Sequence, residues 1–340
     1  MEKIIARIKE YKAKIDSVTV SAKRDITREQ FTFLLGGVSS FRITPGISEH
    51  MGFNKLYHCK TEQDSMMVKN HLQRMFGIVD KESLLQACGR QFRCGVDYEQ
   101  FRTFWVGAPI FDINELHERG RAAFETQKAA AEPFHAFLQE KGFYAWDISE
   151  CVTLARSAVA AGIISEADFW EISDHWVKVA QVFYHSFEEY AISLLCGAAY
   201  FIYRGDMSAV EKFIDLNMNL LDQLLGEDKL WSTSNWYKPE KREYADLVPV
   251  NAGCIITKAA LENEDIRYMV HSVPAEGRPD SGWRFFVGNE SEEYMDNPEN
   301  MVVVGINTIC NINPTIMAYI CAEVGKCYGF ANGKWTEEDL

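Results

Sequence analysis

The residues whose types and spacing could most readily carry out chemistry lie in the C-terminal third, in a stretch that begins Asp280-Ser281-Gly282-Trp283. A serine beside an acid could act as a nucleophile, but a nucleophile requires a neighbouring base. His271 is the one histidine between residues 251 and 340, and it is not close to the serine in sequence. We therefore interpret Asp280-Ser281-Gly282 as a tight turn into a strand, in which the aspartate accepts backbone N–H groups and the glycine supplies a positive φ. No catalytic residue is predicted.

Carboxylates are concentrated just after this turn, at Glu290, Glu292, Glu293, Asp296 and Glu299. Carboxylate oxygens are suitable ligands for hard cations such as Ca²⁺. These acids lack the alternating spacing and the glycine of a calcium-binding loop. We therefore predict no metal site and no cofactor, and we interpret the acids as a solvated surface.

The composition restricts the classes of partner. The chain has 340 residues, of which 47% are hydrophobic and 25% charged, as in ordinary globular proteins. Its net charge of −14 repels phosphate backbones and no run of four basic residues occurs, so nucleic-acid binding is not expected. Residues 251–340 hold six Lys or Arg against fourteen Asp or Glu, a balance of −8, which would attract a basic partner.

The sequence predicts a cytoplasmic protein that does not enter a membrane. The first ten residues are typical of an amphipathic helix and not of a signal peptide. The longest apolar run, near Ile192 to Tyr203, is too short and interrupted to span a bilayer. The nine cysteines form no Cys-x-x-Cys pair, so reduced and mostly buried thiols are expected.

Residues typical of the beginnings and ends of helices recur from about Glu62 to Leu225. Ser165, Ser186 and Ser208 each stand three residues ahead of an acid, which predicts capping boxes, and glycines follow the apolar stretches as helix ends require. The helices are expected near residues 148–161, 166–184, 187–203 and 208–225. Their many aromatic residues recur at helical spacing, which is more typical of a core than of a ligand groove.

Four residues of this region could line a ligand pocket: Trp146, Asp147, Arg156 and His175. Asp147 precedes Arg156 by about two and a half helical turns, so no ion pair within one helix is expected. Asp147 is interpreted as a helix N-cap. His175 has no partner at helical spacing that would complete a metal pair, which favours a histidine at the edge of the core.

Several strings of residues in this region carry a resemblance to a known family. They are Ala145-Trp146-Asp147-Ile148, Leu154-Ala155-Arg156, Ala161-Gly162-Ile163-Ile164-Ser165 and Phe183 to Tyr190. Together with flanking residues, about 60–205, they resemble domain-of-unknown-function family 1266. The resemblance implies a mostly helical fold and a bacterial source, and it implies no chemistry because the family has none assigned.

The residue types change after a turn-rich stretch that ends at Pro239. Strand-forming residues recur at 254–257, 266–273, 283–287 and 301–306, and Asn313-Pro314 then predicts the start of a helix. Strands followed by a late helix are typical of an α+β domain. We therefore predict a mostly α N-terminal helical domain plus a small α+β C-terminal domain with an antiparallel sheet. The expected ranges are a helical arm at 1–45, the helical domain at 46–226, a linker at 227–251 and the α+β domain at 252–340.

The C-terminal domain carries a second resemblance. The matching strings are Ile256-Thr257-Lys258, Asp280 to Phe285, Gly288-x-Glu290, Glu293 to Asn297 and Asn307-Thr308-Ile309. Residues 254–330 resemble domain-of-unknown-function family 2185, which belongs to the immunity-protein-like groups of bacterial polymorphic toxin systems. The resemblance implies a domain that binds and blocks a toxin. The candidate partner-binding residues are Asp280, Ser281, Trp283, Glu290, Glu293, Tyr294 and Asp296.

Three functions remain open from the sequence. The favoured one is a non-catalytic binding protein whose acidic C-terminal surface docks a protein partner, plausibly a toxin effector. The second is a ligand-binding or enzymatic helical domain with a pocket near Trp146, Arg156 and His175. The third is a scaffold without a ligand. The sequence does not determine the oligomeric state.

Overall fold

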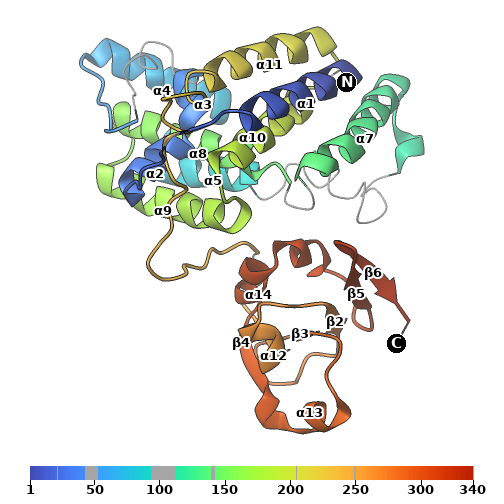
Figure 1. Cartoon of the computed structure of the whole chain (residues 1–340). Coiled ribbons are helices and arrows are strands. Elements are labelled where there is room, and N and C mark those ends of the chain that lie inside the picture. The colour runs from blue at the N-terminus through green and yellow to red at the C-terminus, as the bar shows by residue number, and fades with distance from the viewer. Residues whose placement is uncertain are drawn as a thin grey trace. The chain divides into compact units, whose positions relative to one another are not determined.

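A computed structural model describes residues 1–20, 22–42, 53–92, 112–138, 142–203, 205–248 and 250–339. The chain divides into two compact units, Met1–Arg242 and Glu243–Leu340, which we call the helical unit and the α+β unit. Figure 1 shows helices throughout the first and a sheet in the second. The predicted fold class, a mostly helical part joined to a small α+β part, is confirmed.

The helical unit is built around one completely buried helix. Every residue of α8 is buried, and α8 packs against α9, α10, α5, α4, α3 and α2. A helix that is buried on all sides belongs inside a protein, and the small alanine, serine and valine side chains of α8 allow close approach from several directions. In Figure 1 α8 lies in the middle of the unit. The helices of this unit are α1 Glu2–Asp16, α2 Arg28–Leu35, α3 Gly37–Arg42, α4 Glu62–Phe76, α5 Lys81–Phe92, η2 Ile113–Glu115, α7 Glu118–Leu138, α8 Tyr144–Ala160, α9 Glu166–Phe183, α10 Phe187–Ile202 and α11 Met207–Leu221.

The predicted capping residues are partly correct. Ser165 and Asp168 form the expected capping box of α9. Ser186 caps α10, but the Glu189 carboxylate accepts the N–H of His185 instead of that of Ser186. The prediction for Ser208 is wrong, because the cap of α11 lies two residues earlier, at Asp206, whose carboxylate accepts the N–H groups of Ser208 and Ala209. An aspartate reaches these N–H groups as well as a serine does, and the sequence offered both.

The α+β unit contains one six-stranded sheet in the order β4-β1-β3-β2-β5-β6. Strands β1 and β3 are parallel, and the other neighbouring pairs are antiparallel. The sheet is therefore mixed instead of wholly antiparallel, because β1 lies between β3 and β4 and not beside β2. The elements are β1 Gly253–Thr257, α12 Lys258–Glu262, β2 Tyr268–His271, β3 Asp280–Phe286, α13 Glu292–Asp296, η4 Pro298–Asn300, β4 Met301–Gly305, α14 Ile306–Ile312, η5 Pro314–Tyr319, β5 Cys327–Ala331 and β6 Lys334–Glu338.

The segment expected to link the domains is divided between the two units. Residues 227–242 belong to the helical unit, where Trp231 is fully buried. Residues 243–251 belong to the α+β unit, where Asn311 and Asn307 of α14 bind the backbone of Ala245 and Leu247. Turn-rich composition alone does not distinguish a linker from a stretch of irregular chain that packs on a domain.

None of the described helices is long and apolar enough to cross a membrane. Of the described cysteines, which carry free thiols, Cys59 is partly exposed and Cys321 exposed, while the rest are buried.

Candidate functional site

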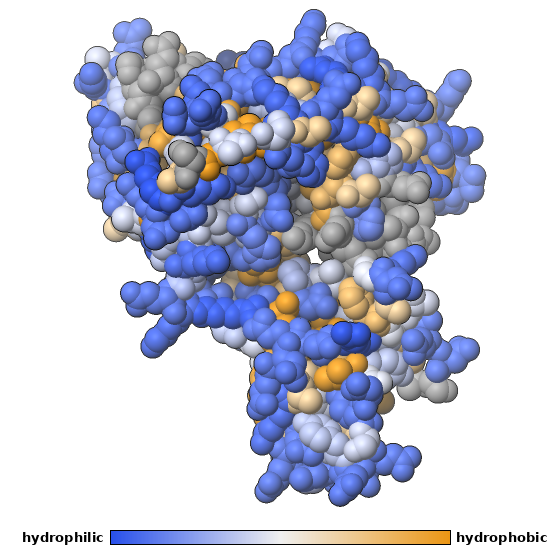
Figure 2. Space-filling view, in the orientation of Figure 1, coloured by the Kyte–Doolittle hydropathy of each residue, from blue (hydrophilic) through white to orange (hydrophobic). Residues whose placement is uncertain are grey.

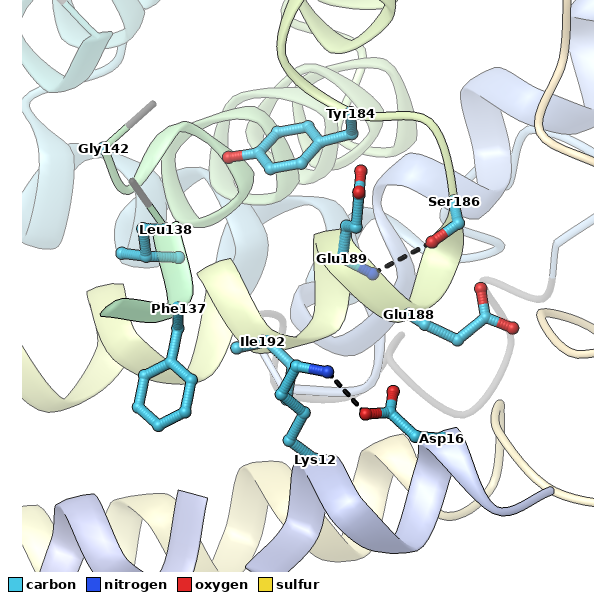
Figure 3. Close-up of a pocket in the computed structure, with 10 residues that line it drawn as sticks. All are labelled: Lys12, Asp16, Phe137, Leu138, Gly142, Tyr184, Ser186, Glu188, Glu189 and Ile192. Atoms are coloured by element: carbon cyan, nitrogen blue, oxygen red, sulfur yellow. Dashed lines mark hydrogen bonds and ion pairs between the residues drawn. The ribbon is translucent and has the colours of Figure 1, made fainter. Parts of the chain in front are cut away.

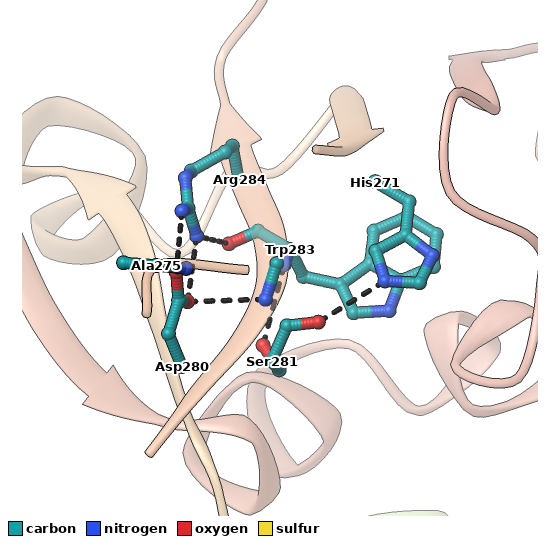
Figure 4. A network of polar contacts seen from close by, with 7 residues as sticks. His271, Ala275, Asp280, Ser281, Trp283 and Arg284 are labelled. Atoms are coloured by element: carbon teal, nitrogen blue, oxygen red, sulfur yellow. Dashed lines mark hydrogen bonds and ion pairs between the residues drawn. The ribbon is translucent and has the colours of Figure 1, made fainter. Parts of the chain in front are cut away.

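Asp280 forms part of the internal frame of the α+β unit. Its carboxylate accepts two hydrogen bonds from the Arg284 guanidinium, at 2.9 and 2.7 Å, and one each from the N–H groups of Ala275 and Gly282 (Figure 4). The Arg284 side chain, aided by these two N–H groups, holds the pKa of Asp280 well below its ordinary value. Only 12% of the Asp280 side chain is exposed, so its charge is used inside the unit.

Among the residues that the structure describes, no base binds the hydroxyl of Ser281, the serine beside it. The His271 ring lies close, but its Nε2 is 3.0 Å from the carbonyl oxygen of Ser281, and its Nδ1 is 2.7 Å from that of Ala322 (Figure 4). The Ser281 hydroxyl instead accepts the N–H of Trp283. Gly282 has a φ of 82°, and a Cβ there would lie 2.3 Å from the carbonyl oxygen of Ser272. These contacts describe a turn entering β3, as the sequence analysis favoured.

Trp283 is part of the core and offers almost no surface to a partner. It is 1% exposed, stacks on the His271 ring at 4.5 Å, and donates its indole N–H to the carbonyl of Ile320. His271 of β2 and Trp283 of β3 are directly opposite each other in the antiparallel pair, so their stacked rings connect the two strands. An indole that is stacked on one ring, hydrogen-bonded through its N–H and buried in this way stabilises the core of the unit.

Glu290 and Tyr294 hold the loop between β3 and β4, which contains α13, in position through hydrogen bonds to the rest of the unit. The Glu290 carboxylate accepts the N–H groups of Val287 and Gly288 and the hydroxyl of Thr257, each at 2.8 Å. Burial opposes its ionisation, but these hydrogen bonds outweigh burial and lower the pKa of Glu290. The Tyr294 hydroxyl accepts the N–H of Ala259 and ties α13 to α12. Both residues therefore fix the position of the loop.

The acids that face solvent are the ones around α13. Ser291 caps this helix by accepting the N–H of Tyr294. The exposed carboxylates, which we call the acidic face, are Glu292, Glu293, Asp296 and Glu299. Within the part of the chain that the structure describes, none of them forms an ion pair and no group of three metal-ligating residues is found. In Figure 2 the end of the α+β unit that carries α13 is mostly hydrophilic.

In the helical unit, three of the four pocket candidates lie in the core. Trp146 is 6% exposed, and Asp147 and Arg156 are each 1% exposed. Asp147 lies inside α8, so its interpretation as an N-cap is wrong. Burial, reinforced by nearby Glu150, raises the pKa of Asp147 well above its ordinary value, and in the described structure its Oδ2 has no hydrogen-bond partner.

Arg156 binds the protein's own groups. Its guanidinium donates to the Ser40 hydroxyl at 3.0 Å and to the Lys55 carbonyl at 3.1 Å, and it lies over the Phe33 ring at 4.9 Å. Burial lowers the pKa of Arg156 to about 10, which leaves the side chain charged at neutral pH. These contacts connect α8 to the chain around α2 and α3.

A buried polar layer between α3 and α8 was missed by the sequence analysis. The Glu150 carboxylate accepts the Ser39 hydroxyl at 2.7 Å, and the Ser149 hydroxyl lies within hydrogen-bond distance of both the Ser39 hydroxyl and the Gly36 carbonyl. Serines in a helix interior carry no sequence signal that separates a buried network from an exposed face. The signal that could have found it is α8 itself, whose small residues lie on every side.

His175 lies apart from the other three candidates. It lines a cavity of about 420 Å³ together with Lys81, Cys88 and Trp176. The residues that line this cavity do not include Trp146, Asp147 or Arg156. Among the described residues, the cavity beside His175 is therefore separate from the other three candidates.

A second cavity, of about 220 Å³, lies between α1, the end of α7 and the start of α10 (Figure 3). Its charged side chains already bind one another or their neighbours. Lys12 forms an ion pair with Asp16, Glu188 one with Lys23, and Glu189 accepts the N–H of His185. Each of these charged groups therefore already has a partner within the described residues.

Comparison with known families agrees with both units. The model of a protein family of unknown function, DUF1266, matches residues 71–238, within the helical unit. The model described as the immunity protein Imm33 domain matches residues 254–339, almost the whole α+β unit. The chain matches none of the curated proteins and none of the solved structures with which it was compared. The immunity character of the C-terminal resemblance is thus confirmed, whereas the family number 2185 is not. The α+β unit is similar to an immunity domain, and the helical unit to a family without assigned chemistry.

Proposed function

We propose that this protein is an immunity-type binding protein that neutralises a bacterial toxin by docking it on the acidic face of the α+β unit. The observation that carries the proposal is the match of residues 254–339 to an immunity domain. The geometry supports it because no ion pair among the described residues neutralises Glu292, Glu293, Asp296 or Glu299. Exposed charges of one sign attract a partner of the opposite sign and speed its association.

The acidic face is held in a defined shape, which is what a docking surface requires. Glu290 fixes the loop ahead of α13, and Tyr294 joins α13 to α12. At the far end, Asn297 caps η4, and the side-chain amide of Asn300 donates to the Tyr294 carbonyl. A surface that is already ordered pays little conformational entropy when a partner binds.

The test is binding to the toxin-like product of a neighbouring gene, measured by calorimetry and by rescue of growth on co-expression. Reversing two charges together, with Glu293→Lys and Asp296→Lys, should raise the Kd about tenfold or more and weaken the rescue, mainly through slower association. The matched control reverses Glu276 and Glu323, which are also exposed in the α+β unit. The proposal fails if no protein partner binds, or if both double variants bind the partner as the wild type does.

A further inference from the structure

Strand β4 forms one edge of the six-stranded sheet in the α+β unit, and β6 forms the other (Figure 1). An edge strand exposes unpaired backbone N–H and C=O groups, and proteins usually protect such an edge with charged side chains. Strand β6 follows that rule, because Lys334, Glu337 and Glu338 are three of its five residues. Strand β4 has the sequence Met-Val-Val-Val-Gly and carries no charge. Of the two edges, β4 is therefore the one that remains open to another strand.

The backbone hydrogen bonds show which groups of β4 point away from the sheet. In an antiparallel pair, residues that exchange hydrogen bonds alternate along the strand with residues that do not. The Ile306 N–H donates to the Ala252 carbonyl at 3.0 Å and continues the register between β1 and β4. Two and four residues earlier, Val304 and Val302 also bond β1, so Val303 between them points its N–H and C=O away from the sheet.

Four backbone groups of β4 are available to a further strand. They are the Met301 C=O, the N–H and C=O of Val303, and the Gly305 N–H. Among the residues that the structure describes, β1 is the one strand beside β4. Val303 is 74% exposed, so no described part of the chain covers this point of the edge. An antiparallel segment could exchange two hydrogen bonds with Val303 and form one each with Met301 and Gly305.

The edge is held in position before a partner arrives. Strand β4 pairs with β1 along its whole length, from Met301 to Gly305. At its start, the Met301 N–H donates to the Pro298 carbonyl, and Asn297 caps η4. At its end, Gly305 leads directly into α14. An edge that is already ordered loses little conformational entropy when a strand is added.

The charges beside β4 indicate which kind of strand could bind there. The acidic face ends two residues before β4, at Glu299. No Lys or Arg occurs between residues 301 and 325. A second copy of this chain, paired antiparallel about Val303, would place Asn307 opposite Glu299 and would supply no positive charge. A strand with basic residues beside Glu299 would neutralise the acidic face, so the charges favour a basic partner over a second copy.

We propose that the toxin adds a strand to the sheet at β4, through an extended segment that pairs antiparallel with β4 and carries Lys or Arg at its C-terminal end, beside Glu299. This inference rests on the proposed function and names the way in which the partner docks. Addition of a strand to an exposed sheet edge is a recurrent mode of recognition, in which main-chain hydrogen bonds provide affinity and neighbouring side chains provide specificity. Here β4 provides the main-chain bonds, and the acidic face selects the basic end.

Hydrogen exchange tests this arrangement in the full chain, alone and with the toxin-like product of the neighbouring gene. The amides of Val303 and Gly305 should exchange at least about tenfold more slowly in the complex, because both N–H groups would donate to the added strand. The amides of β6 should exchange at unchanged rates. In the toxin, the segment that becomes protected should contain Lys or Arg at its C-terminal end.

Two substitutions at one position separate main-chain pairing from side-chain contact. Val303→Pro removes the outward N–H and no bond to β1, which an edge strand tolerates, and it should raise the Kd for the toxin at least about tenfold. Val303→Thr keeps the N–H and the β-branched shape, and it should change the Kd less than about threefold. Hydrogen exchange of the wild type decides the question if Val303→Pro does not fold.

The possible outcomes distinguish this inference from the proposed function. If the toxin binds but leaves the exchange of the Val303 amide unchanged, or binds Val303→Pro as it binds the wild type, strand addition is overturned while docking on the acidic face stands. A protected toxin segment without Lys or Arg also overturns it. A wild-type chain that sediments as a dimer, and as a monomer with Val303→Pro, would show that a second copy occupies the edge. If no toxin binds, the proposed function and this inference both fail.

Discussion

The two units use their conspicuous charged residues in opposite ways. In the helical unit, Asp147 and Arg156 are both buried within α8, and Arg156 binds groups of the chain itself. In the α+β unit the acids divide: Asp280 and Glu290 bind the chain itself, whereas the four carboxylates of the acidic face remain in solvent. Residue type therefore identifies a candidate binding residue, but the residue can bind a partner only if its hydrogen-bonding groups are not already used within the chain.

Replacing Arg156 tests the buried side of this comparison and has the largest expected effect. Arg156→Ala should lower the free energy of unfolding of the helical unit by about 3 kcal/mol, because it removes the hydrogen bonds to Ser40 and Lys55 and leaves a cavity beside Phe33. Urea unfolding followed by far-UV circular dichroism measures it. The exposed Lys212→Ala on α11 should change stability by less than about 0.5 kcal/mol. If Arg156→Ala unfolds like the wild type, Arg156 is not structural and a ligand role regains support.

Replacing Asp280 tests the acids that bind the chain itself, and the loss of stability that it causes should depend on pH. Asp280→Asn should destabilise the α+β unit by about 2 kcal/mol at neutral pH, since it loses the ion pair with Arg284 and turns an amide N–H toward other donors. The folded chain lowers the pKa of Asp280, so its stabilisation is complete above the unfolded pKa of about 4 and is lost as the pH falls below that value. Wild type and variant should therefore converge in stability on acidification. A constant difference between pH 7 and pH 3 would contradict this account; hydrogen exchange of the β3 amides measures it.

Local sequence patterns predicted most helices and strands, whereas the order of the strands in the sheet depends on pairing between residues far apart in the sequence. The apolar runs correctly placed β1 to β4, and β2 pairs with β3 in the antiparallel sense expected for strands joined by a short loop. The parallel pairing of β1 with β3 could not be predicted, because strand order depends on which strands meet after collapse and not on the strands themselves. Strand β6 escaped notice since its alternation is weak and Trp335 is its one buried residue.

The candidate site was predictable to a similar extent. The turn at Ser281 was correctly interpreted from the residue types of Asp280-Ser281-Gly282. That the His271 ring lies close and contacts the Ser281 carbonyl could not be recognised from the sequence. That Trp283 and Glu290 face inward could not be recognised, since their partners Ile320 and Thr257 lie far away in the sequence. The cavity of about 610 Å³ that Asp25, Phe187 and Trp236 line could not be predicted for the same reason, because its walls come from segments that are far apart in the sequence.

The smallest expected effect compares two glutamates of the same loop, Glu290 and Glu292. Glu290→Gln should destabilise the α+β unit by about 1 kcal/mol, because its amide would direct N–H groups toward the donors of Val287, Gly288 or Thr257. Glu292→Gln should leave stability unchanged within about 0.5 kcal/mol, because that side chain is exposed and forms no ion pair among the described residues. Thermal unfolding of both variants measures the contrast.

Partner binding should respond in the reverse sense: Glu292→Gln removes a charge from the acidic face, and Glu290→Gln affects binding only so far as the loop moves. Equal stability of the two variants would mean that Glu290 does not frame the loop, and that the acidic face lacks the rigid support on which docking depends.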